Sequence, residues 1–194
     1  TRIMKKILLA LIAISLSTML RAQDIAANGV PIGNNTVMYA TSDIKIFNGK
    51  EKNSGVYSEV GLSLACEYNT KTKIKKWVVS LSLITDGKLT IKEGMQMLLK
   101  GVNGSVMTLK NNTEHYPKYW ASRDMYFTAA NYPATAQQFN LLKSKDFCKI
   151  RIVTQIKKLY YNLKGDEVKS ALSKCYNVIQ KEISNKTAGV YEGF

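Results

Sequence analysis

The chain has 194 residues, with 28 Lys or Arg against 14 Asp or Glu, so its formal net charge is +14. This length suits one domain with a sizeable core, and the charge favours anionic partners such as acidic glycans, lipopolysaccharide, anionic membrane surfaces or nucleic acid. One histidine and three cysteines without a Cys-x-x-Cys pair exclude a His-rich metal site and leave zinc or thioredoxin-like sites without ligands. We expect no metal and no cofactor.

The N-terminal segment 1–22 has the layout of a secretory signal peptide. Two lysines precede the apolar run Ile7–Leu16, and small and polar residues follow it. A signal peptide has an apolar region of this length, whereas a membrane-spanning helix needs roughly 20 apolar residues. The pattern predicts cleavage near Ala22 or Gln23 and a secreted or periplasmic protein, with an uncleaved anchor as the alternative. Cleavage removes four cations and no acid, which lowers the net charge from +14 to +10.

The predicted mature chain has three parts. Residues 23–35 contain Asn, Gly and Pro and few apolar side chains, which predicts a flexible leader. A single α+β domain over 36–186 follows, and residues 187–194 are expected to be a loose tail. The domain begins with two short apolar runs at 36–39 and 44–47, and no later segment is long and apolar enough to span a membrane.

The clearest strand of the domain runs from Val56 to Tyr68. Its apolar residues alternate with more polar ones, a period of two that indicates one buried and one wetter face. A second strand from Ile74 to Ile84 places Trp77 and three aliphatic residues inward. A polar turn separates the two strands, so we expect an antiparallel hairpin.

A second hairpin is predicted at Asn103-Gly104, which lies between two apolar runs. Both residues tolerate the positive φ angles of a two-residue type I′ turn. Such a turn places Val102 opposite Ser105 and Leu98 opposite Leu109. With this register both faces of the hairpin are apolar, so we expect both to be covered.

A short helix and a strand follow. Thr135 and Gln138 have the spacing of a capping box, which predicts a helix near 135–143. The next strand, 147–154, has an apolar face (Ile150, Ile152) and a basic face (Lys149, Arg151). Another short strand is expected near 159–163.

The C-terminal part has the clearest helical pattern. An apolar stripe at spacings of three and four residues predicts an amphipathic helix near 167–185, with Asp166 as its cap. The stripe consists of Val168, Leu172, Cys175, Ile179 and Ile183. These elements together predict an α+β fold, mainly antiparallel and sandwich-like, with the helix packed on a sheet.

Two stretches of the sequence form a pattern. The first leads from Ile91–Lys100 through Asn103-Gly104 to Leu109, and the second leads from Phe139–Leu142 to Lys149–Ile152. Together they resemble small secreted β-rich proteins of Bacteroidetes-type bacteria, which are largely uncharacterised. The resemblance implies a secreted, β-rich protein and assigns no functional residue.

The aromatic-rich residues 115–132 are the best candidate for a ligand-binding site. Aromatic faces stack on sugar rings, and neighbouring charged groups bind hydroxyl or acidic groups. The candidate residues are Tyr116, Tyr119, Trp120, Arg123 and Tyr126. The alternative is that these aromatic residues form the core of a strand.

The sequence offers little catalytic chemistry. His115 is expected in a surface loop, and Cys66, Cys148 and Cys175 as buried unpaired thiols, with one disulfide plus a free thiol as the alternative. Any two of four acids can in principle form the carboxylate pair of a glycosidase. They are Asp86, Glu93, Glu114 and Asp124.

We therefore expect an exported, non-enzymatic binding or structural protein of the bacterial envelope. Its partner is expected to be a glycan, an anionic envelope polymer or another protein, and not a specific nucleic acid. One alternative is a small envelope hydrolase that uses paired carboxylates. Another is an assembly subunit with protein partners, which requires an exposed apolar patch.

Overall fold

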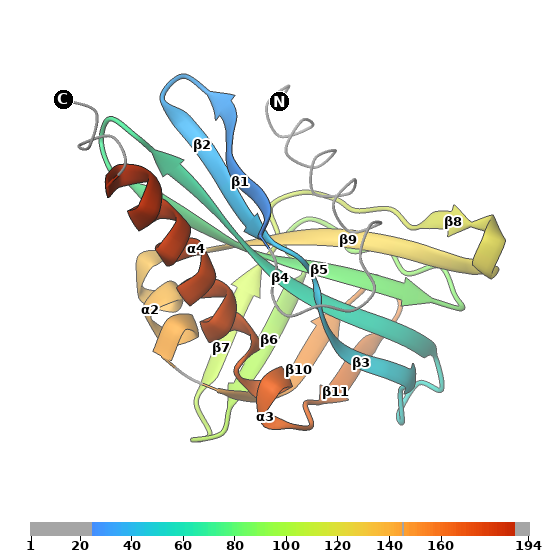
Figure 1. Ribbon diagram of the computed structural model, residues 1–194. Helices are drawn as coiled ribbons and strands as arrows, with labels where there is room; N and C mark the ends of the chain where they lie inside the picture. Colours follow the sequence, from blue (N-terminus) through green and yellow to red (C-terminus); the bar gives the residue numbers. More distant parts are fainter. Residues whose placement is uncertain (1–24, 145, 189–194) are drawn as a thin grey trace.

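The computed structural model describes residues 25–144 and 146–188 as a mainly antiparallel α+β fold (Figure 1). The predicted signal peptide, 1–22, and the end of the predicted tail, 189–194, lie outside the described residues. Among the described helices, none has the length and apolar character needed to cross a membrane. The predicted fold class is confirmed.

The first sheet has seven strands in the order β1-β2-β4-β5-β9-β8, with β3 also paired to β4. Long β4 pairs with β3 through its first half, with β2 through its second half, and with β5 along its other edge. The predicted β4–β5 hairpin is therefore confirmed. The strands are β1 Ile25–Gly33, β2 Thr36–Thr41, β3 Ile44–Lys50, β4 Tyr57–Asn69, β5 Lys75–Thr85, β8 Lys118–Trp120 and β9 Met125–Ala134.

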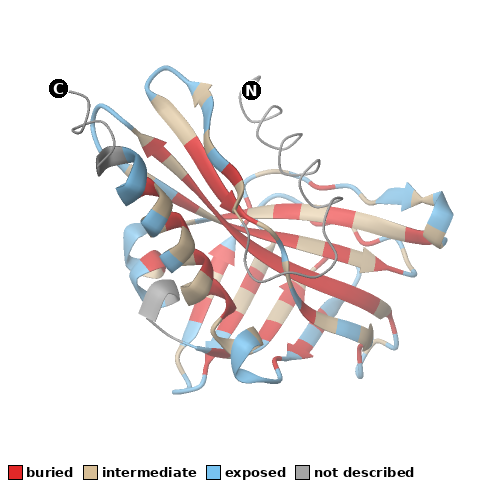
Figure 2. Cartoon of the chain, in the orientation of Figure 1, coloured by how far each residue is buried: buried red, intermediate tan, exposed pale blue. Residues whose placement is uncertain are grey.

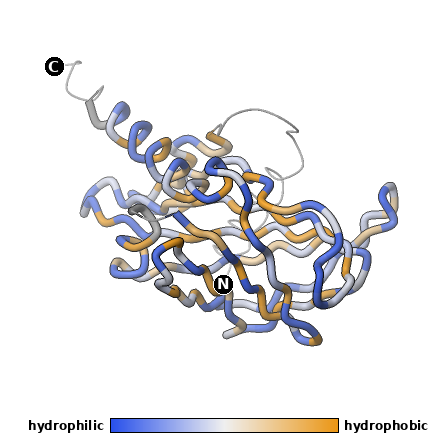
Figure 3. The backbone as a smooth tube through the Cα atoms, turned by 90° about the horizontal axis from the view of Figure 1, so that it is seen from below, coloured by the Kyte–Doolittle hydropathy of each residue, from blue (hydrophilic) through white to orange (hydrophobic). Residues whose placement is uncertain are grey.

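The second sheet has four antiparallel strands in the order β11-β10-β6-β7. They are β6 Gln96–Gly101, β7 Val106–Lys110, β10 Phe147–Val153 and β11 Lys158–Asn162. The helices are η1 Ala121–Arg123, α2 Ala136–Ser144, α3 Asp166–Lys169 and α4 Ala171–Ala188. Hydrophobic and hydrophilic segments are interspersed along the backbone (Figure 3).

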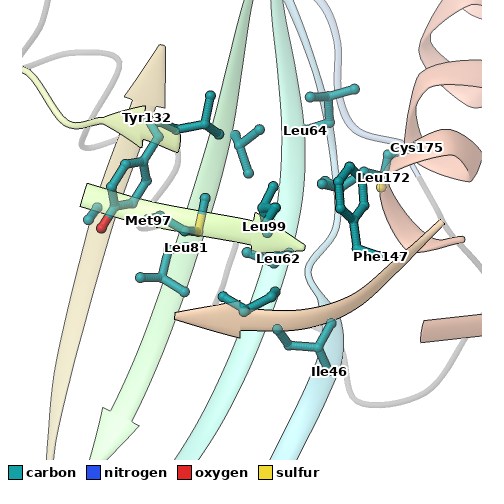
Figure 4. Packing of buried hydrophobic residues seen from close by; sticks show 14 of the residues in the cluster. Ile46, Leu62, Leu64, Leu81, Met97, Leu99, Tyr132, Phe147, Leu172 and Cys175 are labelled. Atoms are coloured by element: carbon teal, nitrogen blue, oxygen red, sulfur yellow. The ribbon is translucent and has the colours of Figure 1, made fainter. Parts of the chain in front are cut away.

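The inner faces of the two sheets share one hydrophobic core. In Figure 4, Leu62 and Leu81 of the first sheet lie close to Met97 and Leu99 of β6. All four side chains are at most 2 % exposed. Two amphipathic sheets that bury their apolar faces against each other form a sandwich, as the alternation along their strands predicts.

Helix α4 lies across one end of the sandwich (Figure 1), where it contacts β2 and β4. The buried residues of the predicted stripe, Leu172, Cys175, Ile179 and Ile183, face the core, whereas Val168 is half-buried. The predicted single helix 167–185 is in fact two, because the chain leaves α3 at Ser170 before α4 begins. Asp166 is the first residue of α3 and not its cap, which is Gly165.

The capping box of α2 is confirmed. The Thr135 backbone N–H donates to Gln138 Oε1 (2.9 Å), and the Gln138 N–H donates to Thr135 Oγ1 (3.2 Å). Gln138 also donates from Nε2 to the carbonyl of Thr108 in β7 (2.7 Å). The box therefore both starts the helix and ties it to the second sheet.

The expectation of a flexible leader over 23–35 requires correction, because residues 25–33 form β1. This strand pairs with β2 through three register irregularities, and Gly29 has a φ of +68°. Such bulges accommodate Gly and Pro within a strand, which is why no alternation marks β1 in the sequence. Its Ala27 is buried in a small second cluster with Met38 and Ala40.

The register predicted for the Asn103-Gly104 hairpin is wrong by one residue. The Gly101 N–H donates to Ser105 O (2.8 Å), and the Gly104 N–H donates to Gly101 O (3.0 Å). The loop is therefore three residues long, with the positive φ of +85° at Gly104 alone, which is the next most common hairpin loop after the two-residue turn.

The shifted register separates the two faces of this hairpin. Leu98 lies opposite Thr108 instead of Leu109. Met97, Leu99, Met107 and Leu109 all enter the core, whereas Leu98 is only half-buried and Val106 is 58 % exposed. The hairpin thus buries one face and leaves the other partly exposed, and in Figure 2 buried positions alternate with intermediate and exposed ones along the strands of this sheet.

Candidate functional site

The predicted aromatic site lies on the β8–β9 hairpin, at the edge of the first sheet. Tyr119 and Tyr126 are opposite each other in the register, with ring centroids 5.3 Å apart. The Tyr119 hydroxyl donates to Asp124 Oδ1 (2.7 Å), and Lys88 Nζ lies 5.6 Å from the Tyr126 ring centre. Tyr119 is 56 % exposed, so this pair is not core.

Trp120 and Arg123 lie on the opposite side of this hairpin. The Arg123 guanidinium stacks over the Trp120 ring at 5.0 Å from its centroid. Arg123 also forms an ion pair with Glu59 of β4, a residue to which Lys45 binds as well (3.5 Å). Both candidate side chains therefore already have partners within the chain.

Glu59 is a nearly buried carboxylate that sequence reasoning placed on the wetter face of its strand. Burial by itself raises the pKa of the Glu59 carboxyl, but the hydrogen bond from Arg123 and the charge of Lys45 outweigh it and hold that pKa below its ordinary value. On this outer face, Glu59 is therefore paired with two cations of the same chain.

Tyr116 lies outside the strand pairing of the β8–β9 hairpin, in the segment before β8, and is 66 % exposed. Its hydroxyl interacts with the Glu114 carboxylate, which raises the pKa of Tyr116. The structure thus groups Tyr119 with Tyr126, groups Trp120 with Arg123, and leaves Tyr116 beside an acid.

His115 is buried, so the expectation of a surface histidine is wrong. It forms a β-bridge with Ile91, and its Nε2 lies 2.9 Å from Thr113 Oγ1. Burial lowers the pKa of the imidazole, because the charged form loses solvation. The bridge to Ile91 is a long-range contact with no local signal in the sequence.

The three cysteines are unpaired. Cys66 and Cys175 are buried, and burial raises the pKa of the Cys66 thiol to about 12. Cys148 is half-buried, with Sγ 3.5 Å from the carbonyl oxygen of Lys100. The expectation of unpaired thiols is confirmed, although Cys148 is less buried than predicted.

The four candidate acids have separate surroundings. Asp124 accepts from Tyr119, and Asp86 accepts from the Tyr57 N–H (3.2 Å). Glu114 interacts with Tyr116, and Glu93 is exposed in the loop before β6. Within the described part of the chain, no group of three or more His, Cys, Asp or Glu is placed to hold a metal ion.

The outer face of the second sheet has a different composition. We call its twelve outward positions the basic face, because five are cationic and none is acidic. They are Gln96, Leu98, Lys100, Val106, Thr108, Lys110, Lys149, Arg151, Val153, Lys158, Tyr160 and Asn162. Within the described ranges, none of the five cations belongs to an ion pair.

Cross-strand register brings these cations together. Lys149 of β10 lies directly opposite Lys100 of β6, and Arg151 lies between Leu98 of β6 and Tyr160 of β11. Like charges on directly opposed residues repel each other. The face therefore carries a concentrated positive charge that the protein does not neutralise itself.

The basic face is also hollowed. A depression of about 190 Å³ lies over all four strands of the second sheet, and its accessible lining is mostly apolar. Leu98, Val106 and Tyr160 supply apolar surface, and Lys100, Lys149 and Arg151 line it with cations. The arrangement fits a ligand that combines an apolar face with negative charge.

Sequence reasoning identified only part of this surface. The basic alternation of Lys149 and Arg151 was visible in one strand, but Lys100 and Tyr160 join them only through pairing of β10 with β6 and β11. β6, β7 and β11 each contribute a single outward lysine, so the sequence of any one of these strands does not mark the face.

Comparison with known proteins gives no further assignment. No known protein family matches the chain, and no curated protein or solved structure is significantly similar to it.

Proposed function

We propose that this protein is exported and binds an anionic polymer of the bacterial envelope through the basic face, without chemical transformation of that polymer. The observation that carries the proposal is the set of five cations and no acid among twelve outward positions. Uncompensated charge of one sign raises the local concentration of oppositely charged ligands and accelerates their association.

The distribution of the cations supports an extended ligand. Lys158 lies on β11, Lys149 and Arg151 on β10, Lys100 on β6 and Lys110 on β7. Neighbouring strands are about 4.8 Å apart, so four strands present cations over about 14 Å. A polymer that crosses the strands meets several of these charges at once, whereas a small anion meets one or two.

Paired charge variants test this function. We expect the double variant Lys100→Gln/Lys149→Gln to bind dextran sulfate at least tenfold more weakly at moderate ionic strength. The control Lys71→Gln/Lys76→Gln loses the same two charges from exposed positions near the β4–β5 turn and is expected to change affinity less than threefold.

The dependence of the binding affinity on salt concentration provides a second measurement on the same variants. Each cation that contacts a polyanion contributes roughly one unit to the slope of log affinity against log salt concentration. We therefore expect the basic-face variant to reduce the slope by about two and the control to leave it nearly unchanged. Equal losses in both variants would mean that only net charge matters and would contradict the proposal.

Export is a separate part of the proposal, and it is supported by the charged and apolar pattern of residues 1–22. We expect the full chain, expressed in a bacterium with an export pathway, to be recovered outside the cytoplasm with its N-terminus near residue 23 or 24. Recovery of the uncleaved chain in the cytoplasm would contradict export, and an uncleaved chain in the membrane fraction would indicate an anchor.

A second candidate function is glycan binding at the β8–β9 hairpin. It is favoured by the exposed ring of Tyr119 beside Tyr126, because an exposed aromatic face stacks on a sugar ring. We expect Tyr119→Ala to weaken binding of a neutral polysaccharide in a manner that salt does not change. If neutral polysaccharides show no binding to the unmodified protein, this candidate fails.

A further inference from the structure

The centre of the basic face is one cross-strand row of three residues. Arg151 has Leu98 on one side and Tyr160 on the other, in the registers of β10 with β6 and with β11. The row therefore places a guanidinium between an aliphatic and an aromatic side chain. All three residues line the hollow of about 190 Å³.

The Arg151 side chain has an unused donor. Its Nε is buried from solvent and has no hydrogen-bond partner among the described residues. Native proteins rarely leave a buried polar group without a partner, because the group loses its hydrogen bonds to water. A molecule in the hollow reaches this closed Nε only if the side chain moves, but its acceptor oxygens interact directly with the charge of Arg151, which lines the hollow.

The size and lining of the hollow limit the bound group. Pockets for drug-sized ligands measure about 300–1,000 Å³, and this hollow is smaller. Its lining is mostly apolar, and Tyr160 is 43 % exposed. One sugar ring has the necessary features, since its C–H face packs on apolar and aromatic surface while its substituents remain polar.

We propose that the hollow is a subsite for a carboxylate-bearing sugar ring of an acidic polysaccharide. Arg151 binds the ring carboxylate, Tyr160 packs against the ring, and Lys100 and Lys149 attract the neighbouring acidic residues of the chain. The planar guanidinium suits a carboxylate, because it donates two parallel hydrogen bonds to it. This inference rests on the proposed binding function and specifies its ligand.

The shape of the face distinguishes this ligand from other polyanions. Recognition of duplex DNA uses a helix or a two-stranded ribbon that enters a groove, whereas the basic face is hollowed. Peripheral membrane binding buries an apolar face within the lipid interface, whereas Leu98 and Arg151 line a recess. The neutral side chains of Gln96, Thr108 and Asn162 can bond to sugar hydroxyls.

The test compares three probes on the full chain by calorimetry or by thermal shift. Oligogalacturonate carries a carboxylate on each ring, its methyl ester lacks that charge, and dextran sulfate is a polyanion without ring carboxylates. We expect oligogalacturonate to bind at least tenfold more tightly than the ester. Duplex DNA and vesicles of anionic phospholipid complete the panel, and tighter binding of either would overturn the assignment.

Two variants test the subsite itself. Arg151→Lys keeps the charge and loses the planar fork, so we expect at least a tenfold loss for oligogalacturonate and less than a threefold change for dextran sulfate. Tyr160→Thr, which suits an edge strand, is expected to give the same selective loss. Circular dichroism establishes that each variant is folded.

The outcomes separate the two proposals. If the unmodified protein binds none of the polyanions, or binds them without dependence on Lys100 and Lys149, the binding function itself fails. If it binds them through those lysines but Arg151→Lys and Tyr160→Thr weaken both polymers equally or not at all, only the sugar subsite is overturned.

Discussion

The outer faces of the two sheets differ in whether their charged side chains form ion pairs within the protein. On the first sheet, the nearly buried Glu59 binds Arg123 and Lys45, and Arg123 stacks on Trp120. On the second sheet, five cations share a face without an acid. We infer from this comparison that the position of unpaired charge, and not net charge alone, determines where the proposed ligand binds.

The charged residues of the two faces are also expected to contribute differently to the free energy of unfolding. A desolvated carboxylate that accepts hydrogen bonds from a guanidinium depends on its partners, because removal of one leaves the other buried and unpaired. Exposed lysines that oppose each other gain nothing from folding and repel. We therefore expect substitutions on the first face to lower stability, and substitutions on the basic face to change ligand binding.

The largest expected effect is the loss of stability on substitution of a residue on the inner side of β6, compared with one on its outer side. Leu99 is fully buried, and Leu98 lies on the basic face. We expect Leu99→Ala to lower the free energy of unfolding by about 2–5 kcal/mol, and Leu98→Ala to lower it by less than about 1 kcal/mol, since Leu98 is only half-buried. Urea unfolding measures both, and similar losses would contradict the register described above.

Removal of the Glu59 carboxylate is expected to have the next largest effect. Glu59→Gln keeps the side-chain shape but leaves Arg123 and Lys45 without a charged partner. We expect a loss of about 1–3 kcal/mol in the free energy of unfolding. The control Glu93→Gln changes an exposed acid and is expected to change stability by less than about 0.5 kcal/mol.

The same substitution has a pH signature. Since the folded pKa of Glu59 is lowered, its contribution is fully present above the unfolded pKa of about 4.3 and is lost as pH falls through the folded value. The stability difference between the unmodified protein and Glu59→Gln should therefore be largest near pH 7 and shrink below about pH 4. A difference that stays constant to pH 3 would contradict the ion pair.

The smallest expected effect has the opposite sign. Lys149 lies opposite Lys100, so Lys149→Gln removes a cross-strand repulsion, and we expect a gain in stability of about 0.2–1 kcal/mol at low salt. Screening by 1 M salt should remove most of this gain. A loss of stability on substitution would show that Lys149 has a structural partner.

Sequence patterns predicted the elements whose side-chain spacing or hydrogen bonds lie within one short segment of the chain. The alternation in Val56–Tyr68 predicted β4 and its partner β5, but the wetter face expected for β4 is wrong, because Glu59, Ser63 and Ala65 on that face are buried too. The capping box at Thr135 and Gln138 gave the start of α2, because both hydrogen bonds lie within four residues.

The sequence patterns did not predict features that depend on contacts between residues far apart in the chain. β1 is a bulged strand held by β2, and His115 is buried through its bridge to Ile91. The predicted register of the hairpin was wrong because Asn103-Gly104 is compatible with two loop lengths. A shift of one residue in the register moves every side chain of a strand to the other face. That shift concealed the basic face, which exists only once Leu98 and Lys100 point outward.

Titration of the isotope-labelled full chain with dextran sulfate, followed by NMR, distinguishes binding at the basic face from binding through net charge. We expect chemical-shift changes to concentrate on the outward residues of β6, β7, β10 and β11, and Lys45, Glu59 and Arg123 to remain unaffected. Changes spread evenly over all surface lysines, or centred on the β8–β9 hairpin, would contradict binding at the basic face.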